Sequence, residues 1–473
     1  MSSAHSNVAI APQRGRVLTI WTPEDKAFWE REGRAIANRN LWISIPALFL
    51  AFAVWMVWSV VVVNMPNVGF NYTTDQLFWL AAIPALSGAT LRIFYSFLVP
   101  VFGGRRWTAL STASLLLPAL GIGFAVQNPE TPYWVMVLLA ALCGFGGGNF
   151  SSSMANISFF FPKERKGSAL GLNAGLGNLG VSAVQFVVPL VITFALFGGF
   201  GGEPQTWVKG DVTRTMWLQN AGFVWAPFIV LSSILAYFFM HDIADAEASF
   251  AEQAIIFKRK HTWLMCWLYI GTFGSFIGFS AGLPLLIKSQ FPLVDAMKFA
   301  FFGPLIGALT RPFGGWLSDR LGGARVTFAT FVGMILGVFG VLWFLPAGEH
   351  PGHFHGFLLS FLLLFALTGI GNGSTFRMIP VIFMTERQRA VAGQGSLARA
   401  QAIKDANKEA AAVLGFSGAI GAYGGFFIPK SYGSSIALTG GAEAALYGFI
   451  VFYVSCLAIT WWCYARRNAP MPC

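Results

Sequence analysis

The chain has 473 residues, of which 55% are hydrophobic and only 11% are charged. Soluble globular proteins carry charge on about a quarter of their residues, so this composition excludes a soluble domain. The net charge of +11 is concentrated in short connections between long apolar runs, which argues against a nucleic-acid partner. The partner that the composition predicts is the lipid bilayer.

Twelve apolar runs are long enough to cross a bilayer, which takes about 20 residues of helix. Arginines interrupt the second and the eighth run. The expected helix cores are residues 42–65, 76–102, 107–127, 133–161, 167–197, 217–240, 263–287, 295–318, 326–346, 356–384, 410–434 and 443–465. This pattern predicts an all-α integral membrane protein with 12 transmembrane helices.

Basic residues alternate between successive connections and so predict the orientation of the chain. They recur after every second run and at both termini, whereas the alternate connections are poor in Lys and Arg. The best supplied of that poor set is 197–216, with Lys209 and Arg214. Since basic loops stay in the cytoplasm, the terminal segments 1–40 and 467–473 are expected there, at the inner membrane of a bacterium.

The second half of the chain repeats the first. Gly-Ala-Thr-Leu-Arg at 88–92 recurs as Gly-Ala-Leu-Thr-Arg at 307–311, and the fourth and fifth runs likewise match the tenth and eleventh. We therefore expect two pseudo-symmetric six-helix halves, residues 41–240 and 263–466, joined by a cytoplasmic linker at 241–262. Parallel halves of this kind resemble the major facilitator fold, in which the substrate site lies near the bilayer midplane between the halves.

A loop motif supports that resemblance. After the eighth run, Asp319, Arg320 and Gly322 belong to a segment similar to the major facilitator loop signature. The first half departs from it, because Pro100 and Val101 stand where the second half has the Asp-Arg pair.

Arg92 and Arg311 occupy matching places in the middle of two spans. A charge at a helix centre costs roughly 2.5–3.5 kcal/mol. Neither side chain can reach the basic loops, which lie ~10 or more residues away, and no Asp or Glu lies deep in any expected span. Two unpaired guanidiniums facing one cavity predict a small-anion site on the substrate path. A third arginine, Arg377, is instead expected to extend to the interface or to pair with Glu386.

Glycines crowd the fifth and eleventh runs and surround one amide, Asn178. They are Gly171, Gly175, Gly177 and Gly180 in the fifth run, and Gly415, Gly418, Gly421, Gly424 and Gly425 in the eleventh. Close helix packing is the expected role of most of them. Tight packing beside a central cavity favours a small anion over a sugar or drug. Asn178 is expected either to contact the substrate or to bond across helices.

Enzyme signatures are absent from the sequence. There is no P-loop, metal-ligand cluster or catalytic triad, so we expect no enzyme activity, no cofactor and no metal. The histidines at 350, 353 and 355 are expected in a solvated external loop.

The two glycine motifs resemble the paired signature motifs of the nitrate/nitrite porter family, closest to bacterial NarK-type nitrate/nitrite antiporters. They are Gly-Leu-Asn-Ala-Gly-Leu-Gly-Asn-Leu-Gly at 171–180 and Gly-Phe-Ser-Gly-Ala-Ile-Gly at 415–421. Similar stretches lie at 74–78, 102–107 and 273–280, and the resemblance covers nearly the whole chain.

The resemblance implies a nitrate or nitrite anion held between Arg92 and Arg311. It implies aromatic rings above and below the planar anion, at Phe150 and Phe273. Further contacts are implied from the side chains of Asn178 and Tyr269.

The resemblance also assigns positions within the motifs. Gly415 matches a site glycine of the helix 11 motif. Ala174 stands where a close relative has glycine, and its methyl group would narrow the cavity or loosen a helix contact. The remaining signature positions are Gly171, Gly175, Gly177, Gly418 and Gly421.

We expect a monomeric carrier that moves nitrate in and nitrite out by alternating access, in nitrate assimilation or anaerobic nitrate respiration. A proton-coupled carrier usually needs a titratable relay, and the expected spans lack a deep carboxylate. Three alternatives stay open: nitrate/proton symport through Tyr269 or a water chain, transport of a small carboxylate, and an anion channel or receptor.

Overall fold

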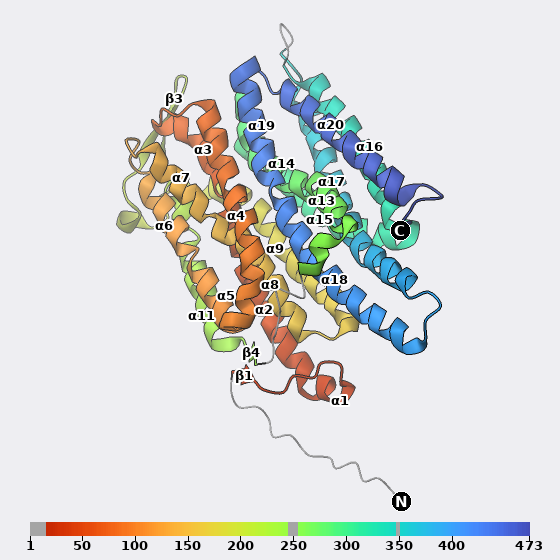
Figure 1. Ribbon diagram of the computed structural model, residues 1–473. Coiled ribbons are helices and arrows are strands. Elements are labelled where there is room, and N and C mark those ends of the chain that lie inside the picture. Colours follow the sequence, from red (N-terminus) through yellow and green to blue (C-terminus); the bar gives the residue numbers. More distant parts are fainter. Residues whose placement is uncertain (1–15, 245–253, 347–350) are drawn as a thin grey trace, which may run out of the picture.

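The computed structural model describes residues 16–244, 254–346 and 351–473, which form a bundle of long helices (Figure 1). Eleven helical segments of this described part are long and apolar enough to cross a membrane. The expected eighth span also forms a helix, α15 (Phe302–Leu321), although Arg311, Asp319 and Arg320 make it less apolar. The prediction of a helical membrane protein is confirmed.

The first helix group covers residues 26–239. It consists of α1 (Lys26–Phe28), η1 (Trp29–Gly33), α2 (Arg34–Met56), α3 (Trp58–Asn64), η2 (Met65–Val68), α4 (Thr74–Phe102), α5 (Gly104–Ala113), α6 (Leu116–Ala125), α7 (Tyr133–Leu142), α8 (Gly144–Phe160), α9 (Lys163–Val191), η3 (Gly198–Gly201), α10 (Asn220–Phe223) and α11 (Ala226–Phe239). Several spans are broken into two helices. Two breaks precede Pro118 and Pro227, because a proline cannot donate the next helical hydrogen bond.

The second helix group covers residues 254–465. It consists of η4 (Ala254–Lys258), α13 (Lys260–Tyr269), η5 (Ile270–Gly274), α14 (Ser275–Gln290), η6 (Ala296–Lys298), α15, α16 (Gly323–Phe344), α17 (Phe354–Ala390), α18 (Ser396–Ala422), α19 (Gly424–Thr439), α20 (Glu443–Thr460) and η7 (Trp461–Ala465). Part of the expected linker, 245–253, and His350 lie outside the described residues.

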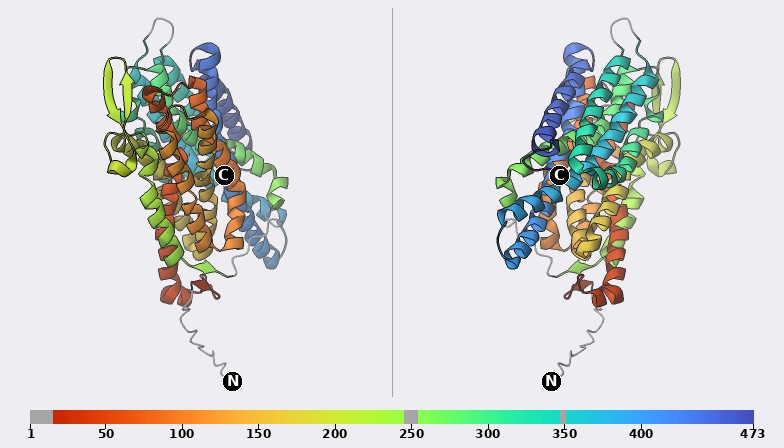
Figure 2. Two further views of the ribbon diagram at one scale, coloured as in Figure 1. Left: turned by 90° about the vertical axis from the view of Figure 1, so that its left-hand side faces the viewer. Right: turned by 90° about the vertical axis from the view of Figure 1, so that its right-hand side faces the viewer.

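Two short strand pairs mark opposite ends of the bundle (Figures 1 and 2). At the leader end, β1 (Val17–Leu18) pairs in parallel with β4 (Asp242–Ile243), close to α1. At the hairpin end, β2 (Gln205–Lys209) and β3 (Val212–Met216) form an antiparallel hairpin within the expected connection 197–216. We use "leader end" and "hairpin end" for these two ends.

The two helix groups share a contact at the start of their third spans. In the first group, the backbone N–H of Arg105 donates to the Asp242 carboxylate (2.7 Å), and the Arg105 Nε donates to its other oxygen (3.1 Å). In the second group, the N–H of Ala324, 219 positions later, donates to the Cys473 carbonyl (3.1 Å). The chain after the last helix of each group thus returns to the start of that group's third span.

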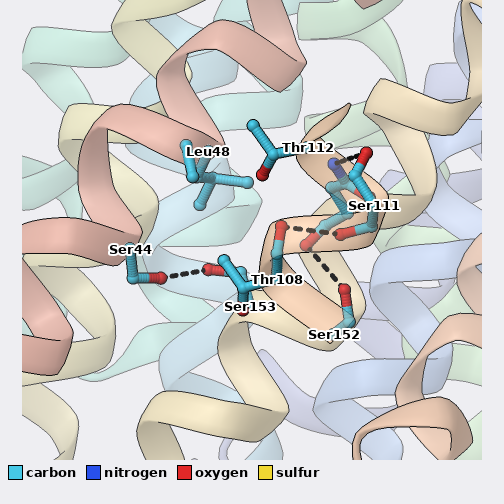
Figure 3. A pocket seen from close by; sticks show the side chains of 9 residues that line it. Ser44, Leu48, Thr108, Ser111, Thr112, Ser152 and Ser153 are labelled. Carbon is cyan, nitrogen blue, oxygen red and sulfur yellow. Dashed lines mark hydrogen bonds between the residues drawn. The ribbon is translucent and has the colours of Figure 1, made fainter. Parts of the chain in front are cut away.

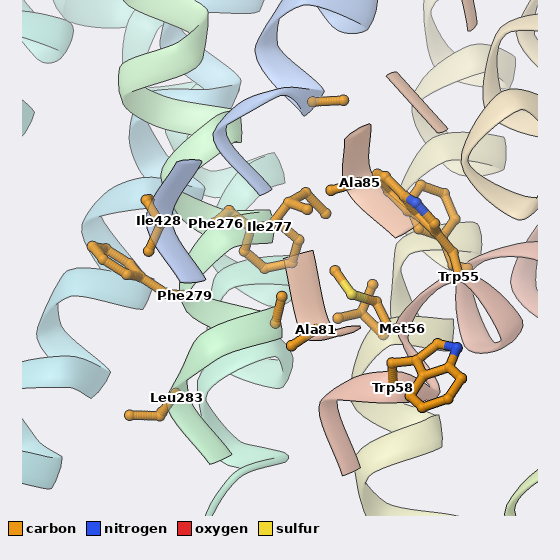
Figure 4. Packing of buried hydrophobic residues seen from close by; sticks show 14 of the residues in the cluster. Trp55, Met56, Trp58, Ala81, Ala85, Phe276, Ile277, Phe279, Leu283 and Ile428 are labelled. Atoms are coloured by element: carbon orange, nitrogen blue, oxygen red, sulfur yellow. The ribbon is translucent and has the colours of Figure 1, made fainter. Parts of the chain in front are cut away.

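Side chains of the two helix groups meet most closely toward the hairpin end. Trp55, Met56 and Ala85 of the first group lie opposite Ile277 and Ile428 of the second (Figure 4). The group contacts there include hydrogen bonds from Gln185 to the Ser280 carbonyl (2.7 Å) and from Ser182 to the Phe301 carbonyl (3.0 Å), and an ion pair between Lys430 and Asp75 (2.7 Å). The bundle is therefore closed at this end.

The eleventh span begins earlier than the sequence predicts. Its expected start was near residue 410, but α18 starts at Ser396 and projects at the leader end (Figure 1). Hydropathy missed this extension because its residues are polar. The extension ends in Glu409, a buried carboxylate that pairs with Arg387 and with Arg259, whose Nη2 is 3.1 Å away.

Glu409→Gln is expected to lower the free energy of unfolding, because neutral glutamine removes the negative charge that pairs with Arg259 and Arg387. Charge-assisted hydrogen bonds of this kind contribute about 1.5–3 kcal/mol. The measurement is thermal unfolding of the purified protein in detergent. Asp405→Asn, one turn away on the same helix and bonded to Gln401, is the control that should change little. Equal midpoints for the two variants would contradict a stabilising role.

Candidate substrate site

Arg92 is buried in the middle of α4, with 1% of the residue exposed. Its Nε donates to the carbonyl of Gly147 on α8 (2.8 Å), and its Nη1 donates to the carbonyl of Gly418 on α18 (2.8 Å). The guanidinium therefore joins the two helix groups. Its Nη2 has no hydrogen-bond partner among the described residues, where no carboxylate forms an ion pair with it either.

Three aromatic rings surround the Arg92 guanidinium. Its Cζ lies 4.6 Å from the ring centroid of Phe150, 5.0 Å from that of Trp55 and 5.2 Å from that of Phe273. Cation–π attraction reaches about 2 kcal/mol where water is excluded. The rings thus replace part of the hydration that Arg92 loses by burial.

Close packing of α4 on α8 brings Arg92 within reach of the Gly147 carbonyl. A Cβ atom on Gly88 would lie 3.0 Å from the Gly147 Cα and 2.6 Å from the Trp55 indole nitrogen. That indole nitrogen donates to the Pro84 carbonyl (2.7 Å), which fixes the ring beside Arg92. Glycine is therefore required here for contact between the two helix backbones.

Arg311 extends from α15 in the second helix group and is partly buried. Its Nη2 contacts the hydroxyl of Tyr269 at 3.5 Å, and its Cζ lies 5.5 Å from the centroid of the Phe376 ring. The Nη1 is buried and has no hydrogen-bond partner among the described residues. Each arginine thus keeps a buried N–H group that can still donate.

Tyr269 and Phe273 connect the surroundings of the two arginines. Tyr269 ends α13, and Phe273 lies in the π-helical turn η5. Their rings stack with centroids 5.4 Å apart and an interplanar angle of 19°. Because Tyr269 contacts Arg311 and Phe273 faces Arg92, the stacked pair bridges the two cations.

The fifth-span motif presents one face to open space. Gly171, Gly175 and Asn178 are spaced by four and three residues, which places them on one face of α9. A Cβ atom at either glycine would meet no heavy atom within 4 Å. Asn178 is 1% exposed, and neither atom of its amide has a partner among the described residues.

The eleventh-span motif also has an open part. Gly418 faces the first helix group, since its carbonyl accepts from Arg92 and a Cβ there would lie 3.9 Å from Phe150. Gly415, one turn closer to the leader end, is exposed, and a Cβ there would meet no atom within 4 Å. Gly171, Gly175 and Gly415 therefore border open space, and each lies in the part of its motif nearer the leader end.

Other motif positions pack helices together, as the sequence predicts. A Cβ atom on Gly177 would lie 2.7 Å from the Leu48 side chain, and one on Gly180 only 2.1 Å from the Phe49 carbonyl. Ala174 is buried in the main apolar cluster, so its methyl group belongs to a packed contact.

A small polar cavity lies between α2, α5 and α8 (Figure 3). The centre of a water molecule has about 10 Å³ in which to lie, which is about the minimum for holding one water. Asn149, the residue before Phe150, lines it and donates to the Ser111 carbonyl (3.2 Å). The Asn149 Oδ1 is buried without a partner among the described residues.

Comparison with known proteins identifies the family. Residues 47–403 match the model of the Major Facilitator Superfamily. The chain is 52% identical over 455 residues to the nitrate/nitrite transporter NarU of Salmonella typhimurium, covering 96% of this chain and 97% of the relative. It is 45% identical over 466 residues to the probable nitrate/nitrite antiporter NarK2 of Thermus thermophilus, covering 97% and 99%. This chain belongs to the major facilitator superfamily.

Solved structures agree on the fold of this major facilitator. A D-xylose–proton symporter aligns with a TM-score of 0.61 at 16% identity, covering 90% of this chain and 97% of that one. The xylose transporter XylE of E. coli gives 0.62 at 14% identity, with the same coverage. The predicted fold, family and multi-pass membrane character are confirmed.

The major facilitator fold brings most of the predicted site residues together. The rings of Phe150 and Phe273 both lie beside the Arg92 guanidinium, and Tyr269 contacts Arg311. Asn178 is buried but makes no hydrogen bond to either arginine. Gly415 lies a turn beyond the contact that Gly418 makes. Their shared role in substrate binding stays a prediction.

Sequence reasoning missed four groups at this site. They are the Trp55 and Phe376 rings and the carbonyls of Gly147 and Gly418, so Arg92 has partners even though it lacks a countercharge. Gly147 and Gly418 lie in the glycine-rich parts of the fourth and eleventh spans, and this composition was a signal for close backbone contact at both.

Arg377 forms a salt bridge, as one of its two expectations proposed, but the partner is Asp319 and not Glu386. Arg377 is exposed, and its Nε donates to the Asp319 carboxylate (2.5 Å) on α15. Glu386 pairs with Arg259 instead (3.5 Å). The pair was missed because α15 and α17 pack side by side and bring residues 58 positions apart together.

Gly421→Ala is expected to lower the midpoint of thermal unfolding, because its Cβ would lie 2.7 Å from the Tyr269 ring and must displace it. Overpacking of this kind costs about 1–3 kcal/mol. Gly415→Ala, on the same helix and facing open space, is the control that should keep or raise the midpoint, because alanine favours a helix over glycine. A fall for Gly415→Ala alone would contradict the assignment of packed and open faces.

Proposed function

We propose that this protein exchanges nitrate for nitrite across the bacterial inner membrane. One observation carries the proposal: Arg92 and Arg311 each keep a buried, unpartnered N–H beside aromatic rings. The names of the relatives, nitrate/nitrite transporter and probable nitrate/nitrite antiporter, agree with a small anion as ligand.

The anion lies between Arg92 and Arg311 in this proposal. A guanidinium is planar and donates parallel hydrogen bonds, which suits a planar oxyanion such as nitrate or nitrite. Phe150 and Phe273 lie against its faces. The Tyr269 hydroxyl, which already contacts Arg311, supplies a further donor.

Polar positions on the leader side complete the proposed passage. The unpartnered amide of Asn178 contacts the anion, and Gly415 leaves it room to pass. The other signature positions belong to α9 and α18, the two helices that approach and separate across the proposed passage.

Transport is proposed to occur by movement of two six-helix halves, residues 41–240 and 263–466, joined by the linker 241–262. The terminal segments 1–40 and 467–473 lie in the cytoplasm, so the leader end faces inward and the hairpin end outward. Open glycine faces on the leader side and cross-group contacts at the hairpin end then correspond to an inward-facing state. We propose that the carrier works as a monomer.

Exchange follows from the electrostatics of the site. An empty carrier has two like charges without a countercharge, which disfavours its return, and a bound anion lowers that barrier. Glu409 is a buried carboxylate that could be considered as a proton relay, but it already pairs with two arginines. It also lies nine residues from Gly418, roughly 13 Å along the helix.

Nitrate/proton symport is the second candidate, because the Tyr269 hydroxyl is a titratable group in contact with Arg311. An anion channel would need no alternating site, and a measurement of saturable counterflow would exclude it. Transport of a small carboxylate predicts competition by formate, whereas the proposed site predicts competition by nitrite.

Proteoliposomes test the choice between exchange and symport. Vesicles loaded with nitrite should take up external nitrate rapidly, and empty vesicles should take up little even with an imposed pH gradient. Uptake into empty vesicles that depends on the pH gradient would overturn exchange. Tyr269→Phe keeps the stacked ring and should retain exchange with a severalfold higher KM.

Arg92→Lys should abolish most exchange, because an ammonium cannot replace the donor fork that serves two carbonyls and an anion. Nitrate uptake by counterflow and nitrate binding to purified protein are the measurements, since binding separates a lost site from a blocked movement. Arg377→Lys, an exposed arginine on α17, is the matched control. Near-normal exchange by Arg92→Lys would exclude the two-arginine site.

A further inference from the structure

A second polar cavity lies at the hairpin end, away from the residues of the candidate substrate site. Its volume is about 130 Å³, room for several water molecules. The β2–β3 hairpin and the end of α3 supply one wall, and the end of α14 with residues 293–297 supplies the other. The two helix groups therefore both contribute to it.

Three cationic side chains line this cavity: Lys209, Arg214 and Lys288. The only carboxylate in the described lining is Asp295, which already accepts the backbone N–H of Met297 (3.2 Å). The Arg214 Cζ lies 3.9 Å from the centroid of the Trp207 ring, which also lines the cavity. Stacking on that ring holds the guanidinium in place.

Lys288 joins the two walls. Its ammonium group donates to the Val63 carbonyl and to the Asn67 side-chain oxygen, both of which belong to the first helix group. An ammonium has three N–H donors, so one remains for a ligand. Among the described residues no carboxylate pairs with Lys288, Lys209 or Arg214.

We propose that this cavity is a second anion site, which takes a small inorganic anion such as nitrate, nitrite or chloride. Three cations against one engaged carboxylate leave a positive field, and a cavity of about 130 Å³ has room for a small ion. Since the walls come from both helix groups, a bound anion stabilises their contact at the hairpin end. Anion in the outer solution thereby favours the state that is closed there.

The test measures thermal unfolding of the purified, delipidated protein in detergent as sodium nitrate or chloride replaces sodium gluconate at constant ionic strength. The background is Arg92→Gln with Arg311→Gln, which removes the candidate substrate site. In this background, nitrate and chloride should still raise the midpoint. Adding Lys209→Gln and Arg214→Gln should remove that rise, or weaken the apparent affinity at least tenfold. The control is Lys298→Gln. Lys298 is exposed and follows directly after the lining residues 293–297, and its variant should keep the rise.

A second measurement uses unmodified arginines, in case the background variant does not fold. Chloride added outside vesicles should slow nitrate/nitrite counterflow by the native protein and not by Lys209→Gln/Arg214→Gln. An unchanged chloride effect in both assays would overturn the site. A rise in the unfolding midpoint with phosphatidylglycerol micelles, but not with nitrate or chloride, would also overturn the site. The ligand would then be a lipid headgroup.

Discussion

A guanidinium buried at mid-membrane must be solvated by the protein itself. At the centre of a span this charge costs roughly 2.5–3.5 kcal/mol. Two backbone carbonyls and three ring faces around Arg92 provide that solvation. The carbonyl of Gly147 is in reach only because a neighbouring glycine, Gly88, lets α4 and α8 touch. The glycine-rich helices are therefore tied to the arginine.

In the proposed exchange, the same interaction couples anion binding to movement. Arg92 donates to Gly418 across the boundary between the helix groups, so that bond can persist only while α18 stays beside α4. An anion that draws the Arg92 guanidinium toward itself competes with this carbonyl. Tyr269 and Phe273 carry the effect to Arg311 by stacking. Occupancy of the proposed site and separation of the two helix groups would thus depend on the same atoms.

The sequence predicts the spans and the arginine pair well, because both follow from the cost of placing charge in an apolar run. It does not predict which rings face the arginines. Trp55 and Phe376 are two among the 16% of residues that are aromatic, and their contacts depend on helix rotation. Gly171 and Gly177 look alike in the motif, yet one borders open space and the other packs on Leu48. Such differences arise only in tertiary structure.

The two ends of the bundle are held by interactions of different strength. At the hairpin end, apolar packing, the Lys288 hydrogen bonds and the Asp75–Lys430 pair all join the two groups, so their separation exposes both charge and apolar surface. At the leader end, the open motif glycines remove side chains that could form a comparable contact. Glycine backbones can nevertheless approach closely once the groups rotate. In the proposed exchange, closure of the leader end therefore draws on the anion between the arginines, whereas side-chain contacts already join the groups at the hairpin end.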